Sequence, residues 1–179
     1  MHATFIKLAK YNQLMNVAVF AAADVLTDER RKADAGAFFK SIHLTLNHIL
    51  WADKNWLRRF VIAGYGYGRL TAGIYENIQD KISDHRFELH SDFAALKQDR
   101  AAVDAKLLTW VTEALNEERL NQVLHYRNAN NEDMSRSVGD ILTHLFNHQT
   151  HHRGQITTLL TQQGVDIGVT DYISLSTRW

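Results

Sequence analysis

Four of the ten histidines in this sequence lie in one short stretch, HLFNHQTHHRGQ at 144–155. If this stretch is helical, residues four apart lie about 6 Å apart along the axis and differ by about 40° in direction. Two imidazoles at that spacing can bind one metal ion, each at about 2.0–2.1 Å. His144 and His152 would lie about 12 Å apart along the axis, too far to share one ion easily. The helix therefore offers one pair of ligands: 144/148, 148/152 or 148/151.

His148 belongs to each of these pairs and is the firmest single candidate. The pair His148/His152 continues the apolar face that Ile141 and Leu145 begin, so we favour it over the other two. The spacing leaves open whether His144 or His151 also joins the site. We expect His144 to have a structural role beside the site.

A third ligand must come from another helix, because catalytic zinc-type centres usually use three protein ligands and one open position. His43 and His48 lie in a second apolar segment, and periodicity favours His48, which lies beside the apolar face. The sequence HQTHH lacks the glutamate of the H-E-x-x-H motif, so no carboxylate next to the ion is expected as general base. A bound metal ion would then activate the substrate mainly by polarising it. Nitrogen ligands suit zinc or nickel, and also iron or copper.

The composition of the chain excludes several classes of function. Its 179 residues are enough for a single domain, 1–179, with a sizeable core. Basic and acidic residues number 20 each, which argues against a nucleic-acid-binding surface. The absence of cysteine excludes disulfides, thiolate zinc ligands and a cysteine nucleophile. The N-terminus has no signal-peptide pattern, and the most apolar stretch, VAVFAAADVL, is too short to span a bilayer. We therefore expect a cytoplasmic protein that does not contact membranes.

The elements that must position the histidines follow from the apolar spacing, which predicts four long helices at about 3–28, 36–63, 91–116 and 137–163. No proline interrupts them. We predict an all-α fold, a four-helix bundle with a long crossover connection between helices two and three. A short helix is expected near 72–82 and a hairpin around NANNED at 128–133. Ser137, with Asp140 three residues later, predicts the start of the last helix, and Gly164 its end.

Two segments carry a resemblance to a known family: TLNHILWADKNWLRR at 45–59 and HLFNHQTHHRGQITTLLTQQGVD at 144–166. In these segments the sequence resembles the DinB/YfiT-like family of proposed metalloenzymes. The resemblance implies a four-helix bundle whose metal ion is bound by one histidine of the second helix and two of the last. Residue by residue, these positions are His48, His148 and His152.

The resemblance also implies a reaction class. Relatives include transferases and isomerases that use a low-molecular-weight thiol, so a thiol is an expected co-substrate beside a small-molecule substrate. Such families commonly form dimers, and the aromatic tail that ends in Trp179 could pack against a second copy.

Two functional hypotheses follow. The first is a mononuclear metal-dependent enzyme with a three-histidine site, a thiol-dependent S-transferase or a hydrolase. The second is a non-catalytic, dimeric helical-bundle binding protein with a structural or vestigial metal site. Haem ligation by bundle histidines is a third option, although the chain lacks the C-x-x-C-H attachment motif. Asn12 and Asn16 could face the site or only solvent, and Arg153 and Gln155 could orient the ligands or cap neighbouring groups.

Overall fold

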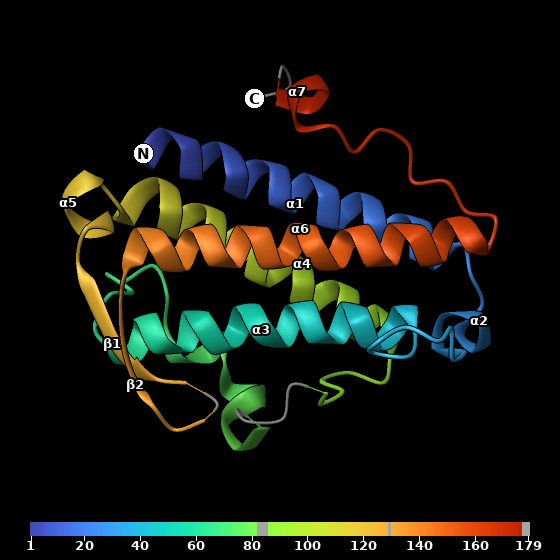
Figure 1. The fold of residues 1–179 in the computed structure, drawn as a ribbon, viewed down its shortest axis with the longest axis horizontal. Helices are drawn as coiled ribbons and strands as arrows, with labels where there is room; N and C mark the ends of the chain where they lie inside the picture. Colours follow the sequence, from blue (N-terminus) through green and yellow to red (C-terminus); the bar gives the residue numbers. More distant parts are fainter. Residues whose placement is uncertain (82–85, 129, 177–179) are drawn as a thin grey trace.

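A computed structural model describes residues 1–81, 86–128 and 130–176 of the chain. Its frame consists of four long helices that lie side by side (Figure 1): α1 at His2–Asp24, α3 at Ile42–Ile62, α4 at Phe93–Thr109 and α6 at Val138–Gln162. Helix α1 packs on α4 and α6, and α3 packs on the same two helices. Their facing sides meet in one apolar core, with Leu46, Leu96 and Leu142 among its fully buried side chains.

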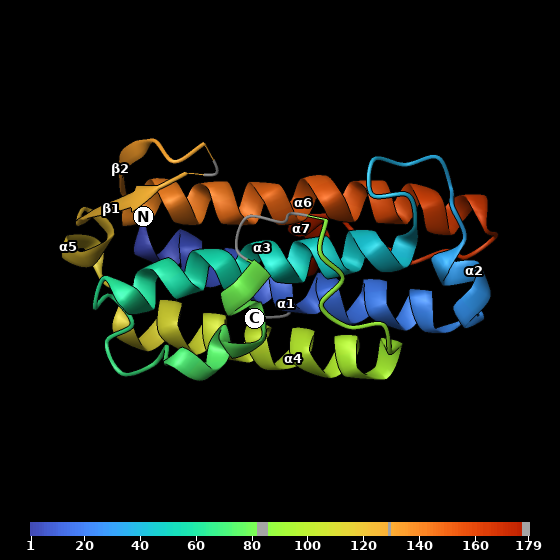
Figure 2. The same ribbon diagram turned by 90° about the horizontal axis from the view of Figure 1, so that it is seen from below.

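The two views show how the chain connects these helices. Helices α1 and α6 run in one direction along the molecule, and α3 and α4 run in the other (Figures 1 and 2). The chain between α3 and α4 therefore returns along the length of the molecule. It contains two short 3₁₀ helices, η1 at Ala72–Ile74 and η2 at Glu76–Lys81, within the segment where a short helix was predicted. Residue 82, the end of that prediction, lies outside the described residues, as does Trp179.

Two predicted helix boundaries differ from the structure for local reasons. The first helix ends at Asp24 and not near 28, because Thr27 caps a separate short helix, α2 at Asp28–Lys32, by accepting from the backbone of Arg30. The second long helix begins at Ile42 and not at 36. The preceding residues form a tight turn, with positive φ at Gly36 (69°) and Lys40 (66°), and a helix cannot include such residues.

The third predicted helix also divides. Helix α4 ends at Thr109 and continues as a π-helical turn, η3 at Trp110–Ala114, before a short helix, α5 at Glu117–Leu120. By contrast, the start of α6 agrees with the sequence pattern. Ser137 Oγ accepts a hydrogen bond from the backbone N–H of Asp140 at 3.0 Å, and Gly164 beyond the end has φ of 78°.

The all-α class was too narrow, because the structure is mostly helical but also contains a small sheet. Strands β1 at Val123–Arg127 and β2 at Asp133–Ser137 pair in antiparallel register around the predicted NANNED turn. The hairpin lies at the end of the molecule where α3 ends and α6 begins (Figure 1). Strand β2 leads directly into α6, so the hairpin fixes the entry to the helix that carries the histidines. A last short helix, α7, spans Tyr172–Leu175.

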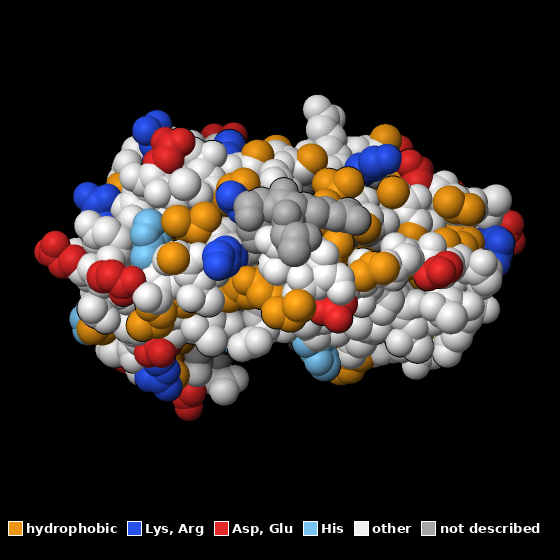
Figure 3. Space-filling view, turned by 90° about the horizontal axis from the view of Figure 1, so that it is seen from above, with side chains coloured by type: hydrophobic (Ala, Val, Ile, Leu, Met, Phe, Trp, Pro, Cys, Tyr) orange, Lys and Arg blue, Asp and Glu red, His pale blue; other side chains and the backbone are white. Residues whose placement is uncertain are grey.

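The visible surface agrees with the balanced composition. On the face that carries α1 and the C-terminal segment, basic and acidic side chains are interspersed (Figure 3). None of the helices in the described ranges combines the length and apolar character that a membrane span requires.

Candidate metal centre

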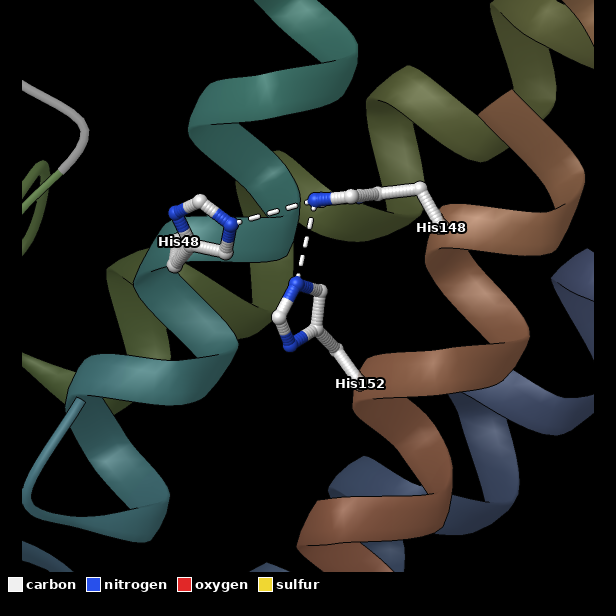
Figure 4. Close-up of side chains that lie close together, drawn as sticks. All are labelled: His48, His148 and His152. Atoms are coloured by element: carbon white, nitrogen blue, oxygen red, sulfur yellow. Dashed lines mark hydrogen bonds between the residues drawn. The ribbon is translucent and has the colours of Figure 1, made fainter. Parts of the chain in front are cut away.

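Three histidine side chains converge between α3 and α6. His48 comes from α3, and His148 and His152 come from successive turns of α6 (Figure 4). The Nε2 atom of His148 lies 3.2 Å from Nε2 of His48 and 3.0 Å from Nε2 of His152. One ring nitrogen from each residue lies within 4.8 Å of the other two. The structure thus brings together the three residues selected from the sequence, across 100 residues of chain between His48 and His148.

These distances fit a metal ion. A tetrahedral ion that binds nitrogens at about 2.05 Å places its ligand atoms about 3.3 Å apart. The two Nε2–Nε2 separations, 3.0 and 3.2 Å, correspond to ligand–metal–ligand angles of roughly 95° and 103° at the same bond length. Both separations lie within about 0.3 Å of the tetrahedral value. Three protein ligands leave at least one coordination position for a substrate.

The hydrogen bonds of His152 fix its tautomer for metal binding. Its Nδ1 lies 2.7 Å from Oε1 of Gln155, and an amide oxygen can only accept, so Nδ1 carries the proton. Nε2 of His152 then presents a lone pair toward His148. Gln155 is itself oriented, because its Nε2 donates to Nε2 of His151 at 3.3 Å. Such an outer hydrogen bond to the second ring nitrogen is a common feature of histidine ligands.

Two of the imidazoles are kept neutral, as a metal ligand must be. Burial, together with like-charge repulsion from the neighbouring His152 and His48, lowers the pKa of His148 to about 3. Burial likewise lowers the pKa of His152, against the opposing hydrogen bond to Gln155. In the absence of a cation, one His148 nitrogen faces the nitrogens of two neighbours, and a single proton cannot satisfy both well. An ion at this point would resolve that conflict.

Aromatic rings cover one side of the centre. The Phe39 ring stacks on His48 with centroids 3.9 Å apart and meets His152 edge-on at 5.5 Å. Trp51, one turn further along α3, lies 6.0 Å from His48. His48 and His152 are only 6% and 7% exposed, whereas His148 is partly exposed. The tight turn before α3 therefore has a role in the site, because it places Phe39 against two of the three histidines.

The other histidine candidates lie outside the group. His144 is exposed and packs edge-on against Trp56 at 5.4 Å, consistent with the structural role expected for it. His151 is also exposed; it accepts a hydrogen bond from Gln155, and its ring contacts that of His152. His43, the alternative third ligand, is buried on another side of α3, where its Nε2 lies 2.9 Å from both Glu88 Oε1 and the backbone oxygen of His90.

A buried polar network lies beside the centre and joins all four long helices. Arg100 of α4 is fully buried and forms ion pairs with Asp53 at 2.7 Å and Asp104 at 2.8 Å. Asn12 and Asn16 of α1, whose orientation the sequence left open, are buried and donate to Asp104. Burial raises the pKa of Asp104 to about 6, although Arg100 opposes this shift.

The same network joins the two helices that carry the three histidines. Gln149, next to His148 on α6, donates through Nε2 to Asp53 Oδ2 of α3 at 2.5 Å. Arg153 donates to Gln149 at 3.2 Å and to the amide oxygen of Asn12, and burial lowers its pKa to about 10. Arg153 therefore points away from the histidines, unlike Gln155. The network contains two acids and two arginines, whose formal charges balance, and its hydrogen bond between Gln149 and Asp53 joins α6 to α3.

Comparisons with known proteins place the chain in a family. The profile of the DinB family matches residues 1–178. Protein DinB of Bacillus subtilis strain 168 is 27% identical over 166 residues, which cover 93% of this chain and 90% of that protein. No solved structure matches. The family match over nearly the whole length shows that this chain belongs to the DinB family.

Proposed function

We propose that this protein is a mononuclear metal-dependent enzyme with His48, His148 and His152 as its metal ligands. The convergence of their three Nε2 atoms is the observation that carries the proposal. Membership of the DinB family is compatible with it. We further propose that the four long helices form a four-helix bundle within one domain, with the centre between its second and last members. Zinc and nickel are the leading candidates for the ion, followed by iron and copper.

When bound, a divalent ion would supply Lewis-acid chemistry to a substrate atom at the open position. The protein's own residues keep the histidine nitrogens available to such an ion. Gln155 holds His152 in the tautomer that leaves Nε2 free, and burial keeps His148 unprotonated at neutral pH. Phe39 covers one side of the histidines and limits the access of water from that side. These features favour a reaction in which a substrate is polarised at a site from which water is partly excluded.

The proposed reaction classes are S-transfer from a low-molecular-weight thiol and hydrolysis. They differ in the nucleophile, which is an external thiol in the first and water in the second. The chain has no cysteine, so a sulfur nucleophile must come from a co-substrate. We propose the thiol-dependent reaction first, on a small-molecule substrate, in a cytoplasmic homodimer. Light scattering tests the dimer, and thiol consumption against an electrophile tests the reaction.

Metal content is the decisive first measurement. Protein purified without a histidine tag should contain about one metal ion per chain by elemental analysis. His48→Ala and His148→Ala should both lose it. His144→Ala is the matched control, because His144 lies on the same helix but outside the group. This variant should keep its metal.

The outcomes separate the two hypotheses. Little metal in the native protein, even after supplementation with zinc and nickel, would contradict the metalloenzyme. Metal that persists in His48→Ala would contradict the ligand assignment. A full metal complement without thiol-dependent or hydrolytic turnover would favour the non-catalytic binding protein.

A further inference from the structure

A pocket with an unbalanced positive charge lies between the end of α3 and the hairpin. It has a volume of about 440 Å³, and its lining includes Arg58, Arg59, Ile62, His125, Tyr126 and Arg127. Among the residues that the structure describes, no aspartate or glutamate lines it. Arg127 is neutralised by Asp133 of the hairpin at 3.0 Å. Arg58 and Arg59, in contrast, form no ion pair with any carboxylate in the described parts of the chain.

The Arg59 guanidinium is held in place by aromatic rings. Its central carbon lies 4.5 Å from the centroid of Trp56 and 5.2 Å from that of Tyr126, and these two rings meet edge-on at 5.1 Å. Stacking of this kind leaves the in-plane N–H groups of an arginine available to an anion. The side chain is also partly buried, so its charge is less screened than that of an exposed arginine. A partly buried cation without an anionic partner is costly, and a bound anion would offset that cost.

The pocket is connected to the three-histidine centre by ring contacts. The Trp56 ring, on which the Arg59 guanidinium stacks, has its centroid 5.4 Å from that of the His144 ring. The His144 centroid in turn lies 5.8 Å from that of His148. Arg58 and Arg59 follow His48 by ten and eleven residues on the same helix, a rise of about 15–17 Å. An extended pentapeptide spans about 17 Å. A ligand of that size could therefore have one end at the pocket and the other near the histidines.

We propose that Arg58 and Arg59 form a subsite that binds the anionic group, a carboxylate or a phosphate, of the molecule used at the three-histidine centre. The link to that centre rests on the proposed function, whereas the binding of an anion does not. Arginine matches both groups because its planar N–H groups form paired hydrogen bonds with two oxygens. The subsite is thus a specificity element for anionic small molecules, separate from the metal ligands.

The anion-binding part is tested on metal-free protein. Isothermal titration calorimetry at fixed ionic strength would compare inorganic phosphate with succinate, which distinguishes the two kinds of anion. We expect saturable binding of at least one, weakened about tenfold or more in Arg59→Gln. Arg58→Gln is a second variant that leaves the stacked guanidinium in place and should also weaken binding. Arg69→Gln is the control, since Arg69 is exposed and paired with Glu113 at 2.8 Å.

Two results of this titration would contradict the proposed anion-binding subsite. One is the absence of saturable binding of either anion to the native protein. The other is an equal loss in Arg69→Gln, which would mean that only net charge matters. Neither result depends on metal, so failure here is distinguishable from failure of the metal centre.

The link to the histidines is tested on zinc-loaded protein with a pentapeptide that carries a thiol at one end. Its free C-terminal acid should bind about tenfold more tightly than its C-terminal amide. Arg59→Gln should abolish this preference, and Arg69→Gln should retain it. Equal binding of acid and amide to the native protein would overturn the link and leave a separate anion site.

Discussion

Replacement of Gln155 by leucine isolates the contribution of one hydrogen bond to metal affinity. Gln155 is not one of the three proposed metal ligands, but its Oε1 accepts a hydrogen bond from His152 Nδ1 at 2.7 Å. Leucine removes the acceptor at nearly constant volume, and His152 is then free to place its proton on Nε2, where it blocks the ion. Loss of such an outer partner typically lowers metal affinity by about 10- to 100-fold. This range corresponds to about 1.4–2.7 kcal/mol of binding free energy.

The assay is zinc competition against a chromophoric chelator at pH 7.5, with Gln155→Leu, Gln155→Glu and Gln162→Leu measured together. Glutamate restores an acceptor of greater strength, so Gln155→Glu should bind zinc at least as tightly as the native protein. Gln162 is exposed near the end of the same helix, and its replacement should have no effect. The reasoning would be refuted if Gln155→Leu bound zinc with native affinity while His148→Ala did not bind it.

Three further predictions concern stability and the crossover. Asp53→Ala leaves the fully buried Arg100 with a single acidic partner, so it should lower the free energy of unfolding by about 3–5 kcal/mol in urea titrations. A loss below about 1 kcal/mol would mean that the Arg100–Asp53 pair is not buried in solution. The pKa of His148 is about 3 in the folded protein against an ordinary value of 6.5, so its neutral form contributes stability that is complete above pH 6.5 and decreases as the pH falls toward 3. Metal-free native protein should therefore lose up to about 1.4 kcal/mol per pH unit relative to His148→Gln over that window, and parallel pH curves would contradict this. Asn47 pairs through its amide with the backbone N–H and oxygen of His90 at 2.9 and 3.2 Å, so Asn47→Ala should increase hydrogen exchange around residues 86–92 without changing metal content.

The sequence could narrow the choice of histidines because their signals are local. The i, i+4 spacing on an apolar helical face favoured His148 and His152 over two other pairs, the register beside a second apolar face favoured His48 over His43, and the family resemblance implied the same three residues. Helix starts with a side-chain cap, such as Ser137, were also predictable. The turn before α3 was not, because the positive φ of Lys40 is uncommon for a residue other than glycine.

The buried network could not be predicted, since charged residues at helical spacing usually lie in solvent. One signal was present. Arg100 follows Leu96 by four residues and precedes Val103 by three, so it falls on the predicted buried stripe of its helix. Asp53 has the same register between Leu50 and Leu57. A charge on an apolar stripe indicates a buried pair, but only the three-dimensional arrangement shows which opposite charges meet.

The long sequence separation within the centre bears on the order of folding and metal acquisition. His48 and His148 are 100 residues apart, so a newly made chain holds at best the weak pair His148/His152 until α3 packs on α6. A metal ion would then bind to three histidines that folding has already brought together, and would not nucleate folding, unlike the ion of a zinc finger. Discrimination among metals would rest on the rigidity that Asp53 and Gln149 give to the two helices. The same rigidity would let a molecule that has lost its metal ion bind another one without refolding.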